Sequence, residues 1–161
     1  ALPADIEWHL IGHLQSNKAA KALENSAFIH SADSGRLFTR LDRLAGELGV
    51  RPRVLMEVNI SGEESKFGIT TERDALLAAG EAVKCSNLVF CGLMTMAPLG
   101  ADEVMTGRVF SGLRQLRDKM ESEYSIRLPE LSMGMSSDYE AAIREGSTLV
   151  RVGTAIFGRR G

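Results

Sequence analysis

The sequence is poor in cysteine, with only Cys85 and Cys91. Two thiols cannot build the several bridges of a small secreted domain, and they suit a reducing compartment better than an oxidising one. Two cysteines alone also do not make a metal site. His9 and His13 are four residues apart, but a strand-like run separates them, so they lack the shared helix face of a zinc motif. We therefore expect neither a disulfide framework nor a metal centre.

Long hydrophobic runs and an excess of one charge are also absent. No apolar run approaches the roughly 20 residues that cross a bilayer, and the N-terminal segment lacks the basic and apolar regions of a secretion signal. The 19 Lys+Arg and 21 Asp+Glu residues are nearly balanced, and the basic ones are scattered rather than clustered. The sequence thus predicts a cytoplasmic protein without a membrane or nucleic-acid partner.

What the chain does contain is an ordinary globular composition. Its 161 residues are 44% hydrophobic and 25% charged, which suits one domain, and no linker or low-complexity stretch divides residues 1–161. Six strand-like apolar runs alternate with helix-like segments. These runs are residues 6–12, 27–31, 53–61, 88–96, 131–136 and 149–157.

Helical periodicity is clear between the strand-like runs. Leucines recur every three or four residues within 34–49, and a similar apolar stripe lies within 102–120. Thr71 is suited to cap the helix that follows it, and a shorter helix is expected to start near Ser137 or Asp138 and end at Gly146. With the segment after residue 12, five helices alternate with six strands.

Alternation of strands and helices predicts an α/β fold with a parallel sheet and right-handed crossovers. Two closures of such a sheet are compatible with the pattern, an open doubly wound sheet and a (β/α)8 barrel of the TIM type. The first strand–helix turns contain no G-x-G-x-x-G, which disfavours a dinucleotide-binding fold. A complete barrel needs eight strands, and this chain supplies six.

The last two strand–helix units carry the most informative polar residues. Ser136 and Ser137 lie between a strand and a helix, where backbone N–H groups and the helix dipole favour an anion. Gly153 and Thr154 follow the last apolar strand, which Arg151 interrupts with a charge. Together these residues predict a phosphate site with an inward arginine beside it. Alternatively, the serines are helix N-caps and Gly153 is a packing glycine.

Five segments resemble one known family. "WHLIGHLQSNK", "MEVNISGEESKFGI", "GLMTMAP", "LSMGMSSDYEAAI" and "VRVGTAIFG" are similar, in order, to segments of the pyridoxal 5′-phosphate homeostasis proteins. The resemblance implies a single barrel domain like that of alanine racemase, which binds pyridoxal 5′-phosphate as a Schiff base. It also implies a monomer that acts in vitamin B6 and amino-acid homeostasis without established catalytic turnover.

The chain departs from the family at the cofactor lysine. In the family this lysine lies on the first barrel strand and a Gly-Glu-Asn segment follows on the second, and neither is present here. By this comparison residues 6–12 form the third strand, so we expect an N-terminally incomplete barrel of strands three to eight. Covalent cofactor attachment is not expected, and association through the open sheet edges is. The lysines present are Lys18, Lys21, Lys66, Lys84 and Lys119.

The resemblance assigns noncovalent contacts to several residues. Ser136 matches the phosphate-binding serine, with Ser137 as a helper, and Gly153 and Thr154 match the phosphate contacts after the last strand. Arg151 matches the arginine that approaches the pyridine nitrogen. A permanently charged guanidinium there keeps the nitrogen unprotonated, which weakens the ring as an electron sink and favours a carrier role.

Four further residues are candidates for the ring or the cavity. Lys66 occupies the place of a basic residue near the ring oxygen, or else is a solvated loop lysine. Asn59 and Met94 are placed to line the ring, although Met94 also suits the core. His9 is expected to face the ligand cavity from its strand.

Other titratable residues receive smaller roles. His13 and His30 lie near strand ends and are expected to be polar rim residues, and Glu57 receives no role. No catalytic residue and no metal ligand is predicted.

Three functions are compatible with these features. The first is a non-enzymatic protein that binds and delivers pyridoxal phosphate. The second is a racemase-like or decarboxylase-like enzyme, which requires a cofactor lysine and an opposing acid or base. The third is a barrel that binds another phosphorylated metabolite, because its phosphate site would have the same sequence pattern.

Overall fold

The structure, a computed structural model, describes residue 3 and residues 5–158. Within them, six parallel strands form one sheet in the order of the chain. The strands are β1 (His9–Leu10), β2 (Phe28–Ala32), β3 (Arg53–Glu57), β4 (Val89–Met94), β5 (Glu130–Met135) and β6 (Leu149–Arg151). The helices are η1 (Ser16–Lys18), α1 (Ala19–Asn25), α2 (Gly35–Leu48), α3 (Glu72–Ala82), α4 (Glu103–Tyr124), α5 (Tyr139–Arg144) and α6 (Thr154–Phe157).

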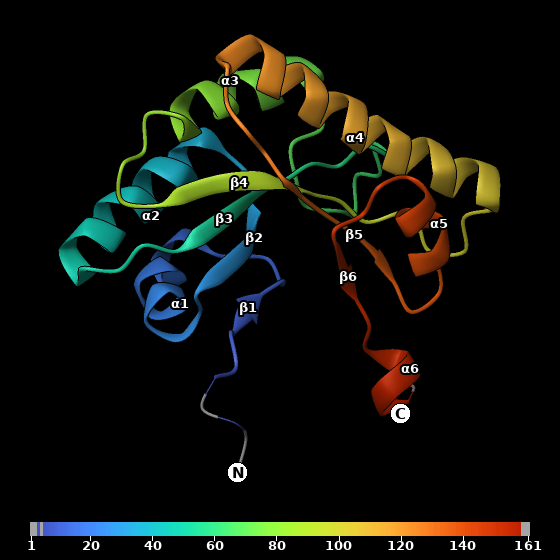
Figure 1. Cartoon of the computed structure of the whole chain (residues 1–161), viewed down its shortest axis with the longest axis horizontal. Coiled ribbons are helices and arrows are strands. Elements are labelled where there is room, and N and C mark those ends of the chain that lie inside the picture. Colours follow the sequence, from blue (N-terminus) through green and yellow to red (C-terminus); the bar gives the residue numbers. More distant parts are fainter. Residues whose placement is uncertain (1–2, 4, 159–161) are drawn as a thin grey trace.

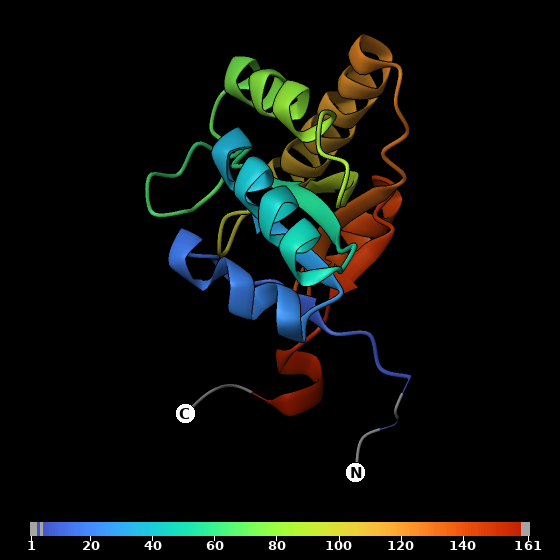
Figure 2. The ribbon, with the colours of Figure 1, turned by 90° about the vertical axis from the view of Figure 1, so that its left-hand side faces the viewer.

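The strand order decides between the two predicted closures. A doubly wound sheet reverses its strand order, which puts helices on both faces. Here each crossover advances by one strand in the same direction, so α1 to α5 lie along the outside of a curved sheet whose ends are β1 and β6 (Figure 1). Figure 2 shows the same helices side by side from another direction. The barrel-type closure is confirmed, as a half-barrel of six strands.

Local sequence signals fix the helix ends. The Ser34 hydroxyl accepts a hydrogen bond from the Leu37 N–H at the start of α2, and Gly49 ends that helix in the left-handed region with φ of 68°. Thr71 caps α3 in the same way through the Asp74 N–H. These caps confirm the helix boundaries expected from the sequence.

The two faces of the sheet carry different layers. Side chains alternate along each strand, so Val54 and Met56 of β3 pack outward under the helices while Leu55 points to the inner face. The outer layer is the large core, which the buried leucines of α2 and α4 complete. The inner face carries a smaller apolar cluster made of Phe28, Leu55, Cys91 and Met94, with Met96 and Leu149 packed against it.

Four of the predicted strands are shorter than expected, including β4, which covers residues 89–94 of the predicted 88–96. β1 contains two residues only, and β3 ends at Glu57 because the Asn59 side chain accepts the Gly62 N–H and turns the chain. The prediction of a strand throughout residues 149–157 was wrong. After Gly153 the chain forms α6, in which the N–H groups of Ile156 and Phe157 both bond to the Gly153 carbonyl.

The described part of the chain also bears on thiols, metal ligands and membrane spans. Cys85 and Cys91 are free thiols. Between residues 5 and 158, no cluster of histidine, cysteine, aspartate and glutamate has the arrangement needed for a metal ion. Over the same residues, no helix combines the length and apolar character that a membrane span requires.

Candidate functional site

Two turns meet at the carboxyl ends of β5 and β6. The Ser136 Oγ, just after β5, accepts hydrogen bonds from the N–H groups of Gly153 and Ala155, both at 3.2 Å. Gly134, two residues before Ser136, has a φ of 96°, and an added Cβ there would lie 2.6 Å from the Ala142 Cβ, so β5 needs glycine where it passes α5. Ser136 and the Gly153–Thr154 turn, far apart in sequence, are therefore brought together.

The structure contradicts the two alternative interpretations of these residues. The N-cap of α5 is Asp138, and its carboxylate accepts the Met135 N–H at 2.6 Å, so neither serine caps the helix. A Cβ added to Gly153 would meet nothing within 4 Å. Gly153 is thus not a packing glycine, and its N–H faces the Ser136 hydroxyl instead.

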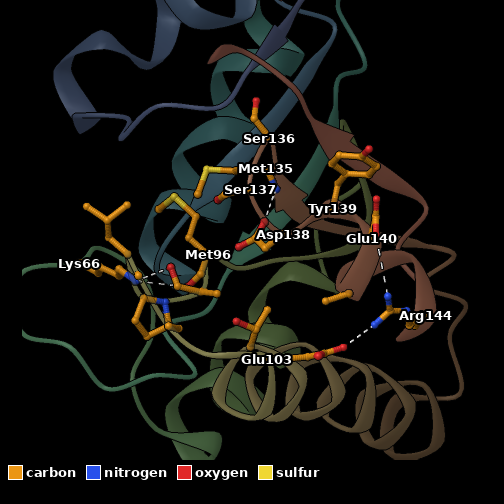
Figure 3. A pocket seen from close by; sticks show the side chains of 17 residues that line it. Lys66, Met96, Glu103, Met135, Ser136, Ser137, Asp138, Tyr139, Glu140 and Arg144 are labelled. Carbon is orange, nitrogen blue, oxygen red and sulfur yellow. Dashed lines mark hydrogen bonds and ion pairs between the residues drawn. The ribbon is translucent and has the colours of Figure 1, made fainter. Parts of the chain in front are cut away.

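A cavity of about 680 Å³ lies beside these turns. Ser136, Ser137 and Met96 contribute to its lining, and Figure 3 shows Lys66 and Tyr139 on opposite sides of it. An ion pair between Arg144 and Glu103, 2.6 Å long, lies along the α4 side of the cavity. Arg151, Gly153, Thr154, Asn59, Met94 and His9 do not line this cavity.

Lys66 reaches the cavity but is held by its surroundings. Its Nζ donates to the Ala97 carbonyl at 2.8 Å and lies 2.5 Å from the Glu63 carboxylate. Asn59 shapes the same loop, because its Nδ2 donates to the Glu63 carbonyl at 2.8 Å and its Oδ1 accepts the Gly62 N–H at 3.0 Å. Lys66 thus joins the loops after β3 and β4, and Asn59 is directed into its own loop.

The inner face of the sheet carries a continuous polar network. Arg151 donates from Nη1 to the Ser132 Oγ at 2.7 Å and from Nη2 to the Thr95 carbonyl at 2.9 Å. The Ser132 Oγ also lies 2.8 Å from the His30 Nδ1, and the His30 Nε2 lies 2.9 Å from the His9 Nδ1. The charge that interrupts β6 therefore has neutral hydrogen-bond partners, one on β5 and one just after β4.

His30 is the centre of this network, and the prediction of a rim position for it was wrong. It lies within β2 and is only 2% exposed, because its side chain points to the inner face rather than to a strand end. Burial above all, and then the charges of His9, Arg151 and Arg53, lowers the pKa of His30 to about 3. His30 is therefore neutral at neutral pH. His13 does lie at the rim, stacked on Phe67 with ring centroids 3.7 Å apart.

His9 faces the network rather than the cavity. It is paired in register with Phe28 at the start of β2, so it lies toward the amino ends of the strands. Its Nε2 lies 3.1 Å from the Glu7 carboxylate. His9 and the turns at Ser136 and Gly153 are consequently at opposite ends of the strands.

Comparison with known proteins identifies the family. Residues 3–161 match the family described as alanine racemase, N-terminal domain. The pyridoxal phosphate homeostasis protein of Synechocystis is 45% identical over 157 residues, which are 97% of this chain and 71% of that protein. The chain belongs to the pyridoxal phosphate homeostasis protein family. It spans 71% of the length of the Synechocystis relative and 60% of the cattle relative.

Solved structures agree with this family assignment. The structure of PipY from Synechococcus elongatus with pyridoxal phosphate bound is 41% identical, with a TM-score of 0.90, over 98% of this chain and 72% of that one. An alanine racemase from Clostridium difficile matches 96% of this chain and 40% of its own with a TM-score of 0.74. At 13% identity the racemase shares the fold alone.

Glu57 was given no role from the sequence, but in the structure it is a buried acid on the inner face of the sheet. Its side chain is 3% exposed, and its Oε2 has no hydrogen-bond partner. Burial, reinforced by Asp33 and opposed by Arg151, raises the pKa of Glu57 to about 7. The signal available in the sequence was parity, since Glu57 is two residues from Leu55 and therefore points to the same inner face of the strand.

Proposed function

We propose that this chain binds pyridoxal phosphate noncovalently at the carboxyl ends of β5 and β6, and acts as a cytoplasmic carrier of the cofactor in vitamin B6 and amino-acid homeostasis. The observation that carries the proposal is the meeting of the Ser136 hydroxyl with the N–H groups of Gly153 and Ala155. Three donor groups converge there without a charged side chain between them.

The phosphate is held by this convergence. Backbone N–H groups and a hydroxyl bind phosphate oxygens through charge-assisted hydrogen bonds, which are stronger than those between neutral groups. A phosphate oxygen takes the acceptor position on Gly153 and Ala155 that the Ser136 Oγ fills, and Ser136 then donates its hydroxyl hydrogen. Thr154, in the same turn, and Ser137, in the adjoining cavity wall, are further donors.

The ring has two kinds of neighbour on the inner face. Met94 and the apolar cluster around it exclude water, and Arg151 offers the N–H groups that Ser132 and Thr95 leave free. Bound pyridoxal phosphate supplies a reactive aldehyde and an electron-withdrawing ring. An arginine at the ring nitrogen donates a hydrogen bond without transferring its proton, so the ring is a poor electron sink. This supports storage and delivery over catalytic turnover.

The lysines support noncovalent binding. None of the five matches the family's cofactor lysine, and Lys66, which lines the cavity, already donates to Ala97 and pairs with Glu63. We propose that Lys66 and Asn59 hold the loop after β3 in place, so that it closes the cavity beside the ligand.

The test is a titration of the chain with pyridoxal phosphate, followed by absorbance and by quenching of Trp8 fluorescence. Ser136→Ala should weaken binding at least about tenfold, because a hydrogen bond to a charged group contributes about 1.5–3 kcal/mol. Ser111→Ala, which removes a hydroxyl from α4, is the matched control and should bind as the parent chain does.

Two comparison ligands complete the design. Pyridoxal without phosphate should bind much more weakly, and inorganic phosphate should compete. Equal affinities of the parent chain and Ser136→Ala would overturn the phosphate site. Binding of other phosphorylated metabolites with equal or higher affinity would identify the barrel as a site for those instead, and racemisation or decarboxylation of an amino acid by the loaded chain would make it an enzyme.

A further inference from the structure

We propose that His30 is a positioning residue that acts through Ser132 to hold the guanidinium of Arg151 toward a ligand on the inner face of the sheet. The proposal rests on the proposed function for the identity of that ligand. The three side chains come from β2, β5 and β6, and they lie in one hydrogen-bonded row.

The direction of every hydrogen in this row follows from chemistry. An arginine only donates, so the Ser132 Oγ accepts from Arg151 and its own hydrogen is available for the His30 Nδ1. His30 then carries its hydrogen on Nε2 and donates it to the His9 Nδ1. His9 in turn donates from Nε2 to the Glu7 carboxylate, 3.1 Å away. All hydrogens therefore point from Arg151 toward Glu7, which lets the bonds polarise one another.

Burial makes this arrangement rigid. Ser132 is fully buried and His30 is 2% exposed, so water cannot replace a lost partner for either side chain. Leaving a buried donor or acceptor unpaired is therefore strongly unfavourable. Because neutral His30 offers one acceptor and one donor, it satisfies Ser132 and His9 together without placing a second cation beside Arg151.

The position of Arg151 needs such a restraint because acidic groups attract it. The charges of Asp138 and Glu57 stabilise its charged form, yet its two hydrogen bonds go to Ser132 and to the Thr95 carbonyl. The Glu57 Oε2 meanwhile has no partner. Neutral acceptors thus hold the guanidinium without neutralising it, and loss of the Ser132–His30 support frees it to turn toward Glu57.

The first experiment does not involve a ligand. In the ¹⁵N-labelled chain, NMR should show His30 as the Nε2–H tautomer and should show slow exchange of the Arg151 guanidinium hydrogens. His30→Leu should speed that exchange about tenfold, whereas His30→Asn, whose Oδ1 can accept from Ser132, should largely restore the slow rate. Similar exchange in the parent chain and in folded His30→Leu would overturn the positioning role.

The second experiment measures affinity for pyridoxal phosphate. His30→Leu should weaken binding about tenfold, and His30→Asn should recover most of the loss. Adding Glu57→Gln to His30→Leu should also recover affinity, because it removes the charge that competes for Arg151. If His30→Leu loses the same affinity for pyridoxal phosphate with and without Glu57→Gln, Glu57 does not compete with the ligand for Arg151. If the parent chain binds no pyridoxal phosphate, the proposed function fails, while the exchange experiment still decides whether His30 positions Arg151.

Discussion

Glu57 and Arg151 attract one another across the inner face of the half-barrel, yet no hydrogen bond joins them. Arg151 donates to Ser132 and to the Thr95 carbonyl, and one carboxyl oxygen of Glu57 has no partner. A buried acid without a partner costs stability when it ionises. The inner face therefore carries a buried carboxyl group whose hydrogen bonding is incomplete.

The first prediction concerns the pH dependence of stability. The pKa of Glu57 is raised from 4.5 to about 7 in the folded chain, so folding favours its protonated form. The stability that this proton supplies is fully present below about pH 4.5 and is lost as the pH rises through 7. Glu57→Gln should therefore gain stability relative to the parent chain between pH 5 and pH 8. Urea unfolding of both chains at pH 5 and at pH 8 measures how much more stable Glu57→Gln is than the parent chain. An equal stability difference at the two pH values would contradict the prediction. Glu64→Gln, on an exposed loop position, controls for the change in net charge.

The second prediction concerns the turn that presents Ser136. Gly134→Ala should destabilise the chain by about 2–4 kcal/mol, since φ is 96° and the new methyl group would lie 2.6 Å from the Ala142 Cβ. Gly107→Ala, within α4 and with open space around it, should instead stabilise the chain by about 0.5–1 kcal/mol. Thermal and urea unfolding measure both changes. Equal stability of the two variants would show that the backbone of Gly134 is not constrained.

The third prediction concerns covalent attachment. After incubation with pyridoxal phosphate and borohydride reduction, intact mass spectrometry should show no stoichiometric adduct on any of the five lysines. Lys66 is the lysine nearest to the candidate site, but its amine is engaged by Ala97 and Glu63. A single adduct mapped to Lys66 would mean that this lysine replaces the family's cofactor lysine, and Lys66→Met would then abolish it.

The fourth prediction concerns the open edges of the sheet. β1 and β6 each pair with one strand only in the described part of the chain, and Trp8 beside β1 is 56% exposed. Unpaired strand edges with apolar side chains promote association. Sedimentation velocity should detect concentration-dependent oligomers, which Trp8→Lys should reduce. Leu99→Lys is the control, because Leu99 is 98% exposed but lies on the loop after β4. If Trp8→Lys and Leu99→Lys reduce oligomer formation equally, the added charge alone explains the reduction.

The sequence by itself determined the periodic features of this protein. Alternating apolar runs predicted six parallel strands, and the Thr71 cap predicted where one helix begins. Such signals are local, since a helix cap depends on residues three positions apart and strand burial on every second residue. The five family segments likewise placed Ser136 and the Gly153–Thr154 turn in one site before their contact was known.

Only the tertiary structure decided which side chains lie on the inner face of the sheet and which groups they contact. His30 was predicted to be a rim residue because it lies near the end of its predicted strand, yet the neighbouring strands enclose it and connect it to Ser132, 102 residues away. The missing partner of Glu57 is equally invisible in sequence, because hydrogen bonding of a buried group depends on atoms from other strands. The half-barrel curvature itself arises from the order in which strands pair, and that order is a property of the assembled sheet.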